Sequence, residues 1–201
     1  MAHPSADAKA VAVGLSRGAF EYQGQKCSAA SRAYIPKSLW KDVKKYLLED
    51  LKSFKMGTTE NFTNFINAVI DEKAYKSITA YIDDAKKSEG VEIIAGGNYD
   101  MRKGYFIEPT VIVASTPQYK TMCEEIFGPV LSIYVYNDKD YEKTLDTLNE
   151  TSQYALTGSI FATDRYAINT AFDKLRHAAG NFYINDKPTD RKSTRLNSSH
   201  Q

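Results

Sequence analysis

Hydrophobic positions along the chain alternate between helical and extended spacing. Five segments place apolar residues three or four positions apart, which predicts amphipathic helices at residues 5–22, 37–52, 71–88, 141–149 and 164–179. Shorter runs rich in β-branched and aromatic residues predict strands at 31–35, 91–95, 105–107, 110–113, 130–136, 159–162 and 181–185. Strands that alternate with helices indicate an α/β fold with a mostly parallel open sheet flanked by helices.

Capping and turn residues set the expected ends of these segments. Ser5, Ser38 and Asp71 each stand where a side-chain oxygen can accept a hydrogen bond from a first-turn N–H group. Pro36 closes the first strand, and Gly90 ends the third helix. We therefore expect one domain over residues 1–189, built from regular elements with a loop at residues 56–67.

The last twelve residues, 190–201, differ in character from the rest. They contain a single large apolar residue, Leu196, among basic and small polar residues. Such a segment cannot bury enough apolar surface to offset the entropy lost on ordering, so we expect a disordered tail outside the domain. A cloning remnant or translation artefact is one interpretation, and a basic interaction tail is the other.

Composition excludes several classes of protein. The 26 basic and 25 acidic residues give a formal charge of +1, so we expect neither a nucleic-acid nor a membrane-surface partner. No apolar run approaches the roughly 20 residues that span a bilayer, and Met1 is not followed by a basic and then apolar leader. Two cysteines, Cys27 and Cys123, are too few for a disulfide scaffold and fit a reducing compartment.

Cys27 is the candidate nucleophile. It follows a helical run that ends in glycine, within Gly24-Gln25-Lys26-Cys27-Ser28. A thiol reacts as its thiolate, so its ordinary pKa of about 8.5 must fall, or a base must accept the proton, for attack near neutral pH. Taken alone, such a cysteine is more often a small buried apolar residue than a nucleophile.

A second motif, Glu124-Glu125-Ile126-Phe127-Gly128-Pro129, follows about a hundred residues later. Together the two motifs resemble the aldehyde dehydrogenase superfamily, in which a Gly-Gln-X-Cys turn carries the nucleophile and a Glu-X-Phe-Gly-Pro turn contacts the nicotinamide ribose. Further segments resemble the Δ1-pyrroline-5-carboxylate (glutamate-γ-semialdehyde) dehydrogenases of proline catabolism; they are residues 19–22, 27–29, 95–97, 104–109, 134–136 and 179–187. The resemblance covers about residues 3 to 189 and implies the catalytic, thiol-bearing domain.

The resemblance implies a role for each motif residue. Cys27 would attack a small-molecule aldehyde, L-glutamate γ-semialdehyde, and hydride would pass to NAD. Glu125 would bind the ribose hydroxyls, and Phe127 would pack against the nicotinamide. Ser28 and Lys26 are the candidates for the amino-acid end of the substrate. Eukaryotic members of this family work in the mitochondrial matrix, which is therefore the expected location.

Other interpretations of these residues stay open at this point. Glu125 could be a solvated loop acid, and Phe127 could belong to the core. Cys27 and His177 could form a thiol–imidazole pair of an acyl-transferring enzyme. Cys123 is expected to be structural, and neither His3 nor His200 has metal-ligand spacing.

The family pattern also predicts parts that the sequence does not contain. Its cofactor domain, thioester-hydrolysing glutamate and oxyanion-hole asparagine lie before the nucleophile helix, and a substrate loop and an oligomerisation strand lie after Thr189. Family members are expected to be homo-oligomers. We therefore expect this polypeptide by itself not to catalyse aldehyde oxidation. The alternative is a non-catalytic fragment that docks on a full-length paralogue or another partner.

Overall fold

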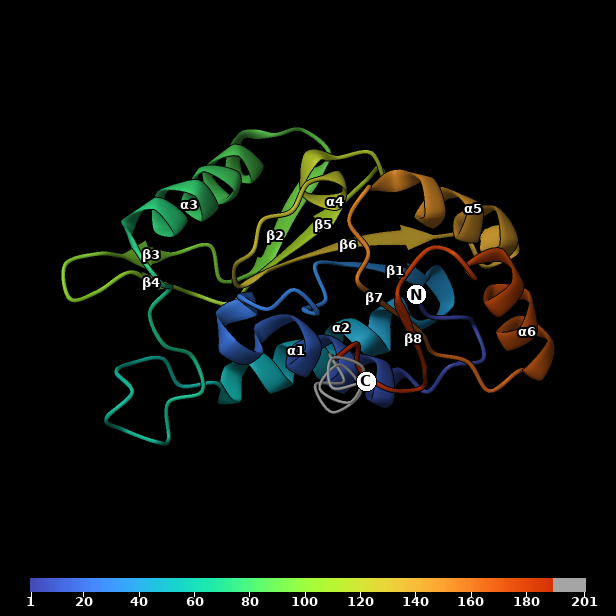
Figure 1. Ribbon diagram of the computed structural model, residues 1–201, viewed down its shortest axis with the longest axis horizontal. Coiled ribbons are helices and arrows are strands. Elements are labelled where there is room, and N and C mark those ends of the chain that lie inside the picture. Colours follow the sequence, from blue (N-terminus) through green and yellow to red (C-terminus); the bar gives the residue numbers. More distant parts are fainter. Residues whose placement is uncertain (190–201) are drawn as a thin grey trace, which may run out of the picture.

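A four-stranded sheet forms the centre of the computed structural model, which describes residues 1–189 (Figure 1). The strands lie in the order β1, β6, β5 and β2. Their bounds are β1 Arg32–Pro36, β2 Val91–Ala95, β5 Thr110–Ala114 and β6 Val130–Tyr136. Strand β6 pairs in parallel with both β1 and β5, whereas β2 runs antiparallel to β5 at the edge. The predicted α/β class and mostly parallel sheet are confirmed.

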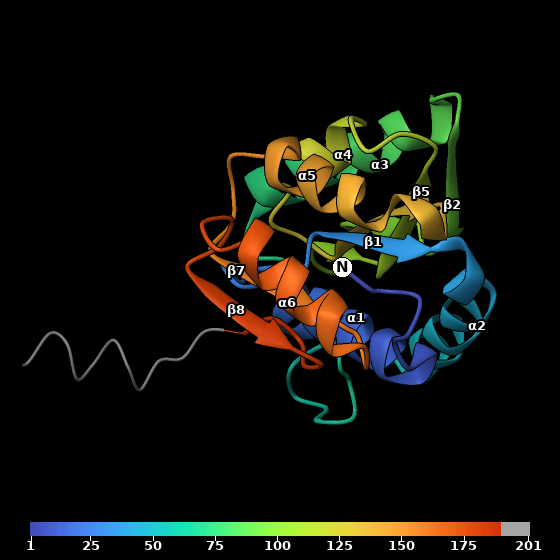
Figure 2. The same ribbon diagram turned by 90° about the vertical axis from the view of Figure 1, so that its right-hand side faces the viewer.

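Helices cover both faces of this sheet (Figures 1 and 2). The bounds are α1 Ala8–Phe20, α2 Lys37–Ser53, α3 Glu72–Lys87, α4 Lys120–Cys123 and α5 Tyr141–Thr151. Helices α1 and α2 pack on the face that carries Ala33, Val111 and Leu131, while α3 packs on the opposite face, against Ile112 and Val130. Because side chains alternate along a strand, covering both faces requires strands that are apolar at nearly every position.

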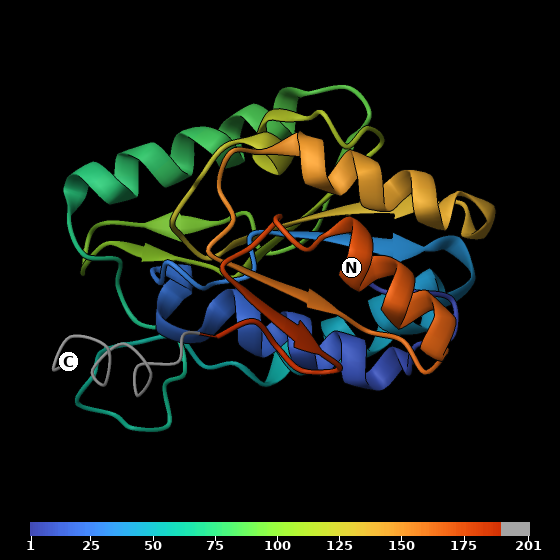
Figure 3. The ribbon, with the colours of Figure 1, turned by 45° about the vertical axis from the view of Figure 1, so that its right-hand side comes forward.

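A second, two-stranded parallel sheet lies beside α1 (Figure 3). It pairs β7 Thr157–Ile160 with β8 Asn181–Ile184, and α6 Arg165–Lys174 forms the crossover between them. A short hairpin joins β3 Tyr99–Asp100 to β4 Phe106–Ile107. A turn of 3₁₀ helix lies at η2 Asp138–Asp140, and η1 Glu21–Gly24 is a tight turn whose central residues are not helical.

Two of the three predicted helix caps are wrong. Asp71 caps α3 as expected, accepting from the Ala74 N–H at 2.7 Å. Helix α1 is capped by Asp7, because the Ser5 hydroxyl instead accepts N–H groups of a turn near Asp164, far along the chain. Ser38 makes no capping bond, because α2 begins at Lys37 with Pro36 at the N-cap position, and the Ser38 backbone N–H donates to the carboxylate of Asp138.

Other differences concern short or terminal segments. Helix α6 ends at Lys174 and does not reach Ala179, and the strand expected at 159–162 lies at Thr157–Ile160. Strand β3 and helix α4 were not predicted. The tail expected at 190–201 lies outside the described residues. Within residues 1–189, no helix is both long and apolar enough to span a bilayer.

Candidate active site

The turn that carries Cys27 begins where helix α1 ends. Tyr22 and Gln23 adopt left-handed backbone conformations with φ of 55° and 57°, and Gly24 follows at 66°. Non-glycine residues seldom adopt this region, because the Cβ atom crowds the backbone. Three such residues in succession reverse the chain sharply, so Cys27 lies in a tight turn and not in a continuing helix.

Gly24 joins the two sequence motifs in space. A Cβ atom at this position would lie 2.1 Å from the Gly128 carbonyl oxygen, so only glycine permits the approach. Gly128 is itself pressed against the Ile78 side chain of α3, where an added Cβ would come within 2.5 Å of Ile78 Cδ1. The cysteine turn and the Glu-Ile-Phe-Gly turn, about a hundred residues apart in sequence, therefore meet backbone to backbone.

Side-chain amides fix the cysteine turn to the segment before α3. The Gln25 Oε1 atom accepts the Ile70 N–H at 3.1 Å, and Gln23 Oε1 accepts the Asn67 N–H at 3.2 Å. The Cys27 N–H and thiol form no hydrogen bond with another described residue. The turn is thus held by its neighbours, while the backbone N–H of Cys27 stays available to a bound group.

Cys27, Glu125, Phe127 and Lys26 border one cavity of about 500 Å³. Its walls come from the ends of both motif turns, from β1 and from the β7–β8 sheet, and they are mostly apolar. Cys27 and Glu125 are exposed at this cavity. Ser28, in contrast, is only 3 % exposed and does not form part of the wall.

The Glu-Ile-Phe-Gly turn presents alternate side chains in opposite directions. Ile126 is buried against α3, whereas Phe127, at a left-handed φ of 56°, remains 43 % exposed. The interpretation of Phe127 as a core residue is therefore wrong. A large apolar ring held open at the cavity in a strained backbone is suited to contact a flat bound group.

The remaining candidates lie away from this cavity wall. His177 is exposed beyond the end of α6, does not border the cavity and forms no hydrogen bond with Cys27. Cys123 is half-buried at the end of α4, where its Sγ atom lies 3.8 Å from the Pro117 carbonyl oxygen. Among residues 1–189 no cluster of three or more His, Cys, Asp or Glu side chains could hold a metal ion.

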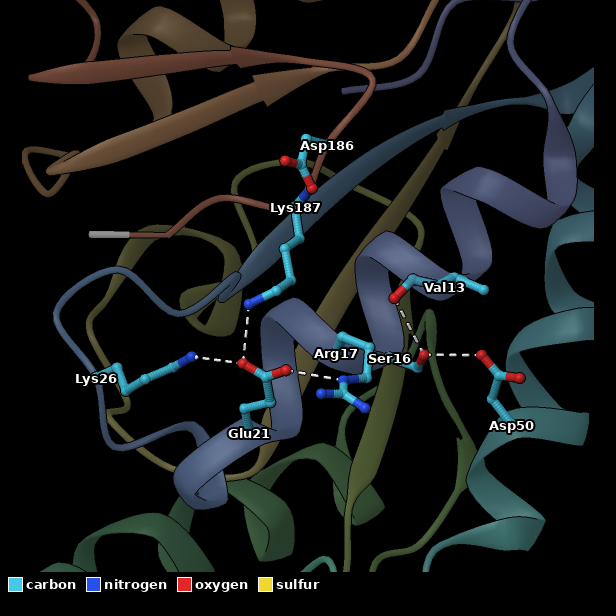
Figure 4. Close-up of polar contacts among 8 residues, drawn as sticks. All are labelled: Val13, Ser16, Arg17, Glu21, Lys26, Asp50, Asp186 and Lys187. Atoms are coloured by element: carbon cyan, nitrogen blue, oxygen red, sulfur yellow. Dashed lines mark hydrogen bonds and ion pairs between the residues drawn. The ribbon is translucent and has the colours of Figure 1, made fainter. Parts of the chain in front are cut away.

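Glu21 is a residue of the site that the sequence did not single out. Its carboxylate accepts hydrogen bonds from Arg17 Nε at 2.8 Å, Lys26 Nζ at 3.0 Å and Lys187 Nζ at 2.9 Å (Figure 4). Burial raises the pKa of Glu21, but the bonds from Lys187, Arg17 and Lys26 outweigh burial and lower the pKa to about 2. Only the Arg17 contact, at helical i,i+4 spacing, could have been inferred from sequence.

A profile described as "Aldehyde dehydrogenase family" matches residues 1–197. The chain belongs to the aldehyde dehydrogenase family. The chain is 57 % identical over 187 residues to a curated relative, the mitochondrial Δ1-pyrroline-5-carboxylate dehydrogenase of Dictyostelium discoideum. The match covers 93 % of the chain and 34 % of the relative. The chain is 48 % identical over 188 residues to the mitochondrial human enzyme of the same name, covering 93 % of the chain and 33 % of that enzyme.

Solved aldehyde dehydrogenases share the fold. The Δ-pyrroline-5-carboxylate dehydrogenase of Mycobacterium tuberculosis superposes with a TM-score of 0.90 at 45 % identity, covering 94 % of this chain and 35 % of that one. The same enzyme bound with NAD gives 0.87 at 45 % identity, covering 94 % and 34 %. The chain thus spans about a third of the length of the relatives that it matches.

Proposed function

We propose that this chain supplies the thiol-bearing part of an NAD-dependent L-glutamate γ-semialdehyde dehydrogenase. The observation that carries the proposal is the contact between Gly24 and Gly128, which brings Cys27 and Glu125 to one cavity. The similarity to Δ1-pyrroline-5-carboxylate dehydrogenases over 93 % of the chain supports the substrate class. Because the Dictyostelium and human relatives are mitochondrial by name, the mitochondrial matrix is the proposed location.

Cys27 is the proposed nucleophile. Its thiolate sulfur forms a bond to the aldehyde carbon, and the carbonyl electron pair moves to oxygen to give a thiohemiacetal oxyanion. The unused Cys27 N–H is a fitting donor to that oxyanion. Loss of hydride leaves a thioester on Cys27, and water then releases glutamate and restores the thiol.

The residues at the cavity fit a nicotinamide cofactor. Glu125 is an exposed carboxylate that can accept hydrogen bonds from two ribose hydroxyls, and the open ring of Phe127 can pack on a flat heterocycle. NAD, when bound, would supply the hydride acceptor. Glu125 and Phe127 therefore act in binding and orientation, not in proton transfer.

Lys26 and Ser28 are proposed to recognise the amino-acid end of the substrate. Lys26 borders the cavity next to Cys27, and its ammonium can pair with a carboxylate. Ser28 is buried behind the wall, so a role in substrate binding requires a small movement of the turn. Of the two, Lys26 is better placed.

The isolated chain is proposed not to catalyse the oxidation of glutamate semialdehyde. Among the described residues no general base contacts Cys27, and each missing stabilising group costs roughly two or more orders of magnitude in rate. Purified residues 1–201 should show no NAD-dependent oxidation of glutamate semialdehyde above a Cys27→Ala control. Activity clearly above that control would contradict this proposal.

The alternative is a non-catalytic chain that docks on a partner. The large apolar residues exposed on this chain include Tyr22, Phe127 and Tyr154. Phe127 and Tyr154 border the cavity, so the surface around the cavity could bind another protein. Size-exclusion chromatography with light scattering tests whether copies of this chain dock on one another. A monomer at micromolar concentration argues against docking between copies of this chain.

A chimera tests the proposed reaction directly. Residues 1–189 would replace the matching third of the Dictyostelium relative, and NADH formation would be followed with glutamate semialdehyde and with propanal. The expected result is NAD-dependent oxidation with a clear preference for glutamate semialdehyde. A folded chimera that oxidises neither aldehyde would overturn the proposal.

A further inference from the structure

Glu21 gathers three positive side chains from three separate parts of the fold. Arg17 comes from helix α1, Lys26 from the cysteine turn and Lys187 from the segment that follows β8 (Figure 4). The Glu21 side chain is only 18 % exposed, and the two lysine side chains are 22 % and 28 % exposed. Partly buried ion pairs of this kind are less screened by solvent and salt than pairs on an open surface.

Two ammonium groups share a single oxygen atom in this cluster. Lys26 Nζ and Lys187 Nζ both donate to Glu21 Oε2, at 3.0 Å and 2.9 Å, so the two nitrogens are close neighbours. Each ammonium has three donors, which leaves two on each lysine for a further acceptor. Without the shared carboxylate, two like charges this close would repel and separate.

The cluster carries excess positive charge at the cavity. Asp186 lies near Lys187 and its carboxylate accepts the Lys187 N–H at 2.7 Å, yet the three cations still outnumber the two carboxylates. Lys26 borders the cavity beside Cys27, and Pro188, next to Lys187, borders it too. Lys187 itself does not border the cavity, but its ammonium shares an oxygen atom with that of Lys26, so an anionic group that approaches Cys27 meets Lys26 with the Lys187 charge behind it.

We propose that Lys187, held beside Lys26 by Glu21, is a specificity-determining residue that favours anionic molecules at Cys27. This inference rests on the proposed function, because it adds the charge of Lys187 to that of Lys26 in recognising the carboxylate end of the aldehyde. Glu21 acts as a positioning residue, which fixes both ammonium groups and touches no substrate. Sequence gives no reason to associate residues 21, 26 and 187.

Alkylation of Cys27 by two reagents of different charge tests the proposal without turnover or cofactor. Iodoacetate is anionic and iodoacetamide is neutral, and the ratio of their rate constants reports the local potential at the thiolate. Any change in thiolate fraction affects both reagents equally and cancels in the ratio. Trypsin cleaves after Lys26 and Arg32, so mass spectrometry can follow Cys27 separately from Cys123.

The Lys187→Met variant of the full chain should lower the iodoacetate-to-iodoacetamide ratio about three-fold, as expected for the loss of one nearby charge in a largely aqueous medium. Lys187→Arg should retain the ratio. The matched control is Lys174→Met, which removes an ammonium that pairs with Asp146 at 2.8 Å on another part of the surface. This control should leave the ratio unchanged.

A double-mutant cycle tests the positioning role of Glu21. In a Glu21→Gln background Lys187 is no longer held, so Lys187→Met should change the ratio by less than half as much as it does in the wild-type chain. An equal effect in both backgrounds would contradict the positioning role of Glu21. A ratio unchanged by Lys187→Met would overturn the proposal that Lys187 favours anionic molecules at Cys27. Neither result would bear on dehydrogenase activity, which the chimera tests separately.

Discussion

Gly24 is the residue on which the geometry of the site depends most. It combines a left-handed φ of 66° with an approach that leaves no room for a Cβ atom beside Gly128. Gly24→Ala should therefore destabilise the fold by about 2 kcal/mol or more, because it adds both backbone strain and a clash with a carbonyl oxygen. Urea unfolding measures the loss.

Gly158→Ala is the matched control for that substitution. Gly158 lies in β7, where an added Cβ would make ordinary contact with the Ala179 Cβ at 3.4 Å. Its free energy of unfolding should change by less than about 1 kcal/mol. If both variants lose the same stability, Gly24 has no special role in joining the two motifs.

Comparing substitutions at two adjacent glutamates distinguishes a specific role in cofactor binding from a general effect of negative charge. Both glutamates are exposed at the cavity, but the Glu124 carboxylate already accepts a hydrogen bond from the Tyr81 hydroxyl at 2.6 Å. In the chimera, Glu125→Gln should raise the KM for NAD about ten-fold, the effect of weakening hydrogen bonds to a charged group. Glu124→Gln should leave that KM within about two-fold, and equal effects would argue against Glu125 as the ribose ligand.

The low pKa of Glu21 predicts acid-sensitive stability. Its pKa falls from 4.5 to about 2 on folding, so the carboxylate stabilises the fold above about pH 4.5, and this contribution is lost as the pH falls towards 2. Glu21→Gln should cost about 2 kcal/mol at pH 7 and much less near pH 2. Thermal unfolding from pH 7 to pH 2 measures this.

Asp50→Asn provides the comparison for that pH series. The Asp50 carboxylate accepts one hydrogen bond, from the Ser16 hydroxyl of α1 at 2.8 Å, and has no cationic partner among the described residues (Figure 4). Its loss should cost less stability at pH 7 than Glu21→Gln does, because only a neutral hydroxyl donates to it. A Glu21→Gln variant as stable as the parent at pH 7 would show that the three cations do not stabilise the fold.

At the scale of elements, helix α3 is the platform for the Glu124–Gly128 turn. Ile78 presses on Gly128, Tyr81 bonds Glu124, and Lys120 Nζ lies 5.0 Å above the centre of the Tyr81 ring. The bond to Glu124 is the main cause that raises the pKa of Tyr81 to about 12. One face of α3 thus holds the segment that presents the candidate cofactor residues.

Loosening this platform should expose the turn to proteolysis. In Tyr81→Phe the ring remains but the bond to Glu124 is lost, so cleavage after Glu124 or Glu125 by a glutamate-specific protease should become about five-fold faster. Tyr99→Phe is the matched control, because Tyr99 makes a similar bond to Asp83 of the same helix, at 2.7 Å, away from the turn. Equal acceleration in both variants would show only a general loss of stability.

The elements that the sequence predicts well are those with strong local patterns. Strand β6 is apolar at almost every position, and α3 combines a helical stripe with a capping Asp71. Strand β3 has two residues and α4 has four with no side-chain cap, so neither gives a periodic signal. Ser5 is a good capping residue whose hydroxyl is engaged by a turn more than 150 residues away, and Ser38 lies one residue inside a helix that begins at Lys37.

At the scale of the whole molecule, the site is built from long-range contacts. Sequence motifs indicated Cys27, Glu125, Phe127 and Lys26, and the fold brings all four to one cavity. The approach of Gly24 to Gly128 and the bond between Glu21 and Lys187 arise only from tertiary packing, because no local pattern relates those positions. Ser28 shows that burial, too, cannot be predicted from a local motif, because it depends on the segments that pack over the residue.

The two cysteines allow the most direct test of the account. The measurement is the initial rate of NADH formation by the chimera that carries residues 1–189, with glutamate semialdehyde as substrate. If Cys27 is the nucleophile, Cys27→Ser should lower kcat at least about a thousand-fold, whereas Cys123→Ser, a change at the half-buried cysteine, should stay within about three-fold of the parent. A Cys27→Ser chimera that folds and retains most of the parent rate would contradict the account.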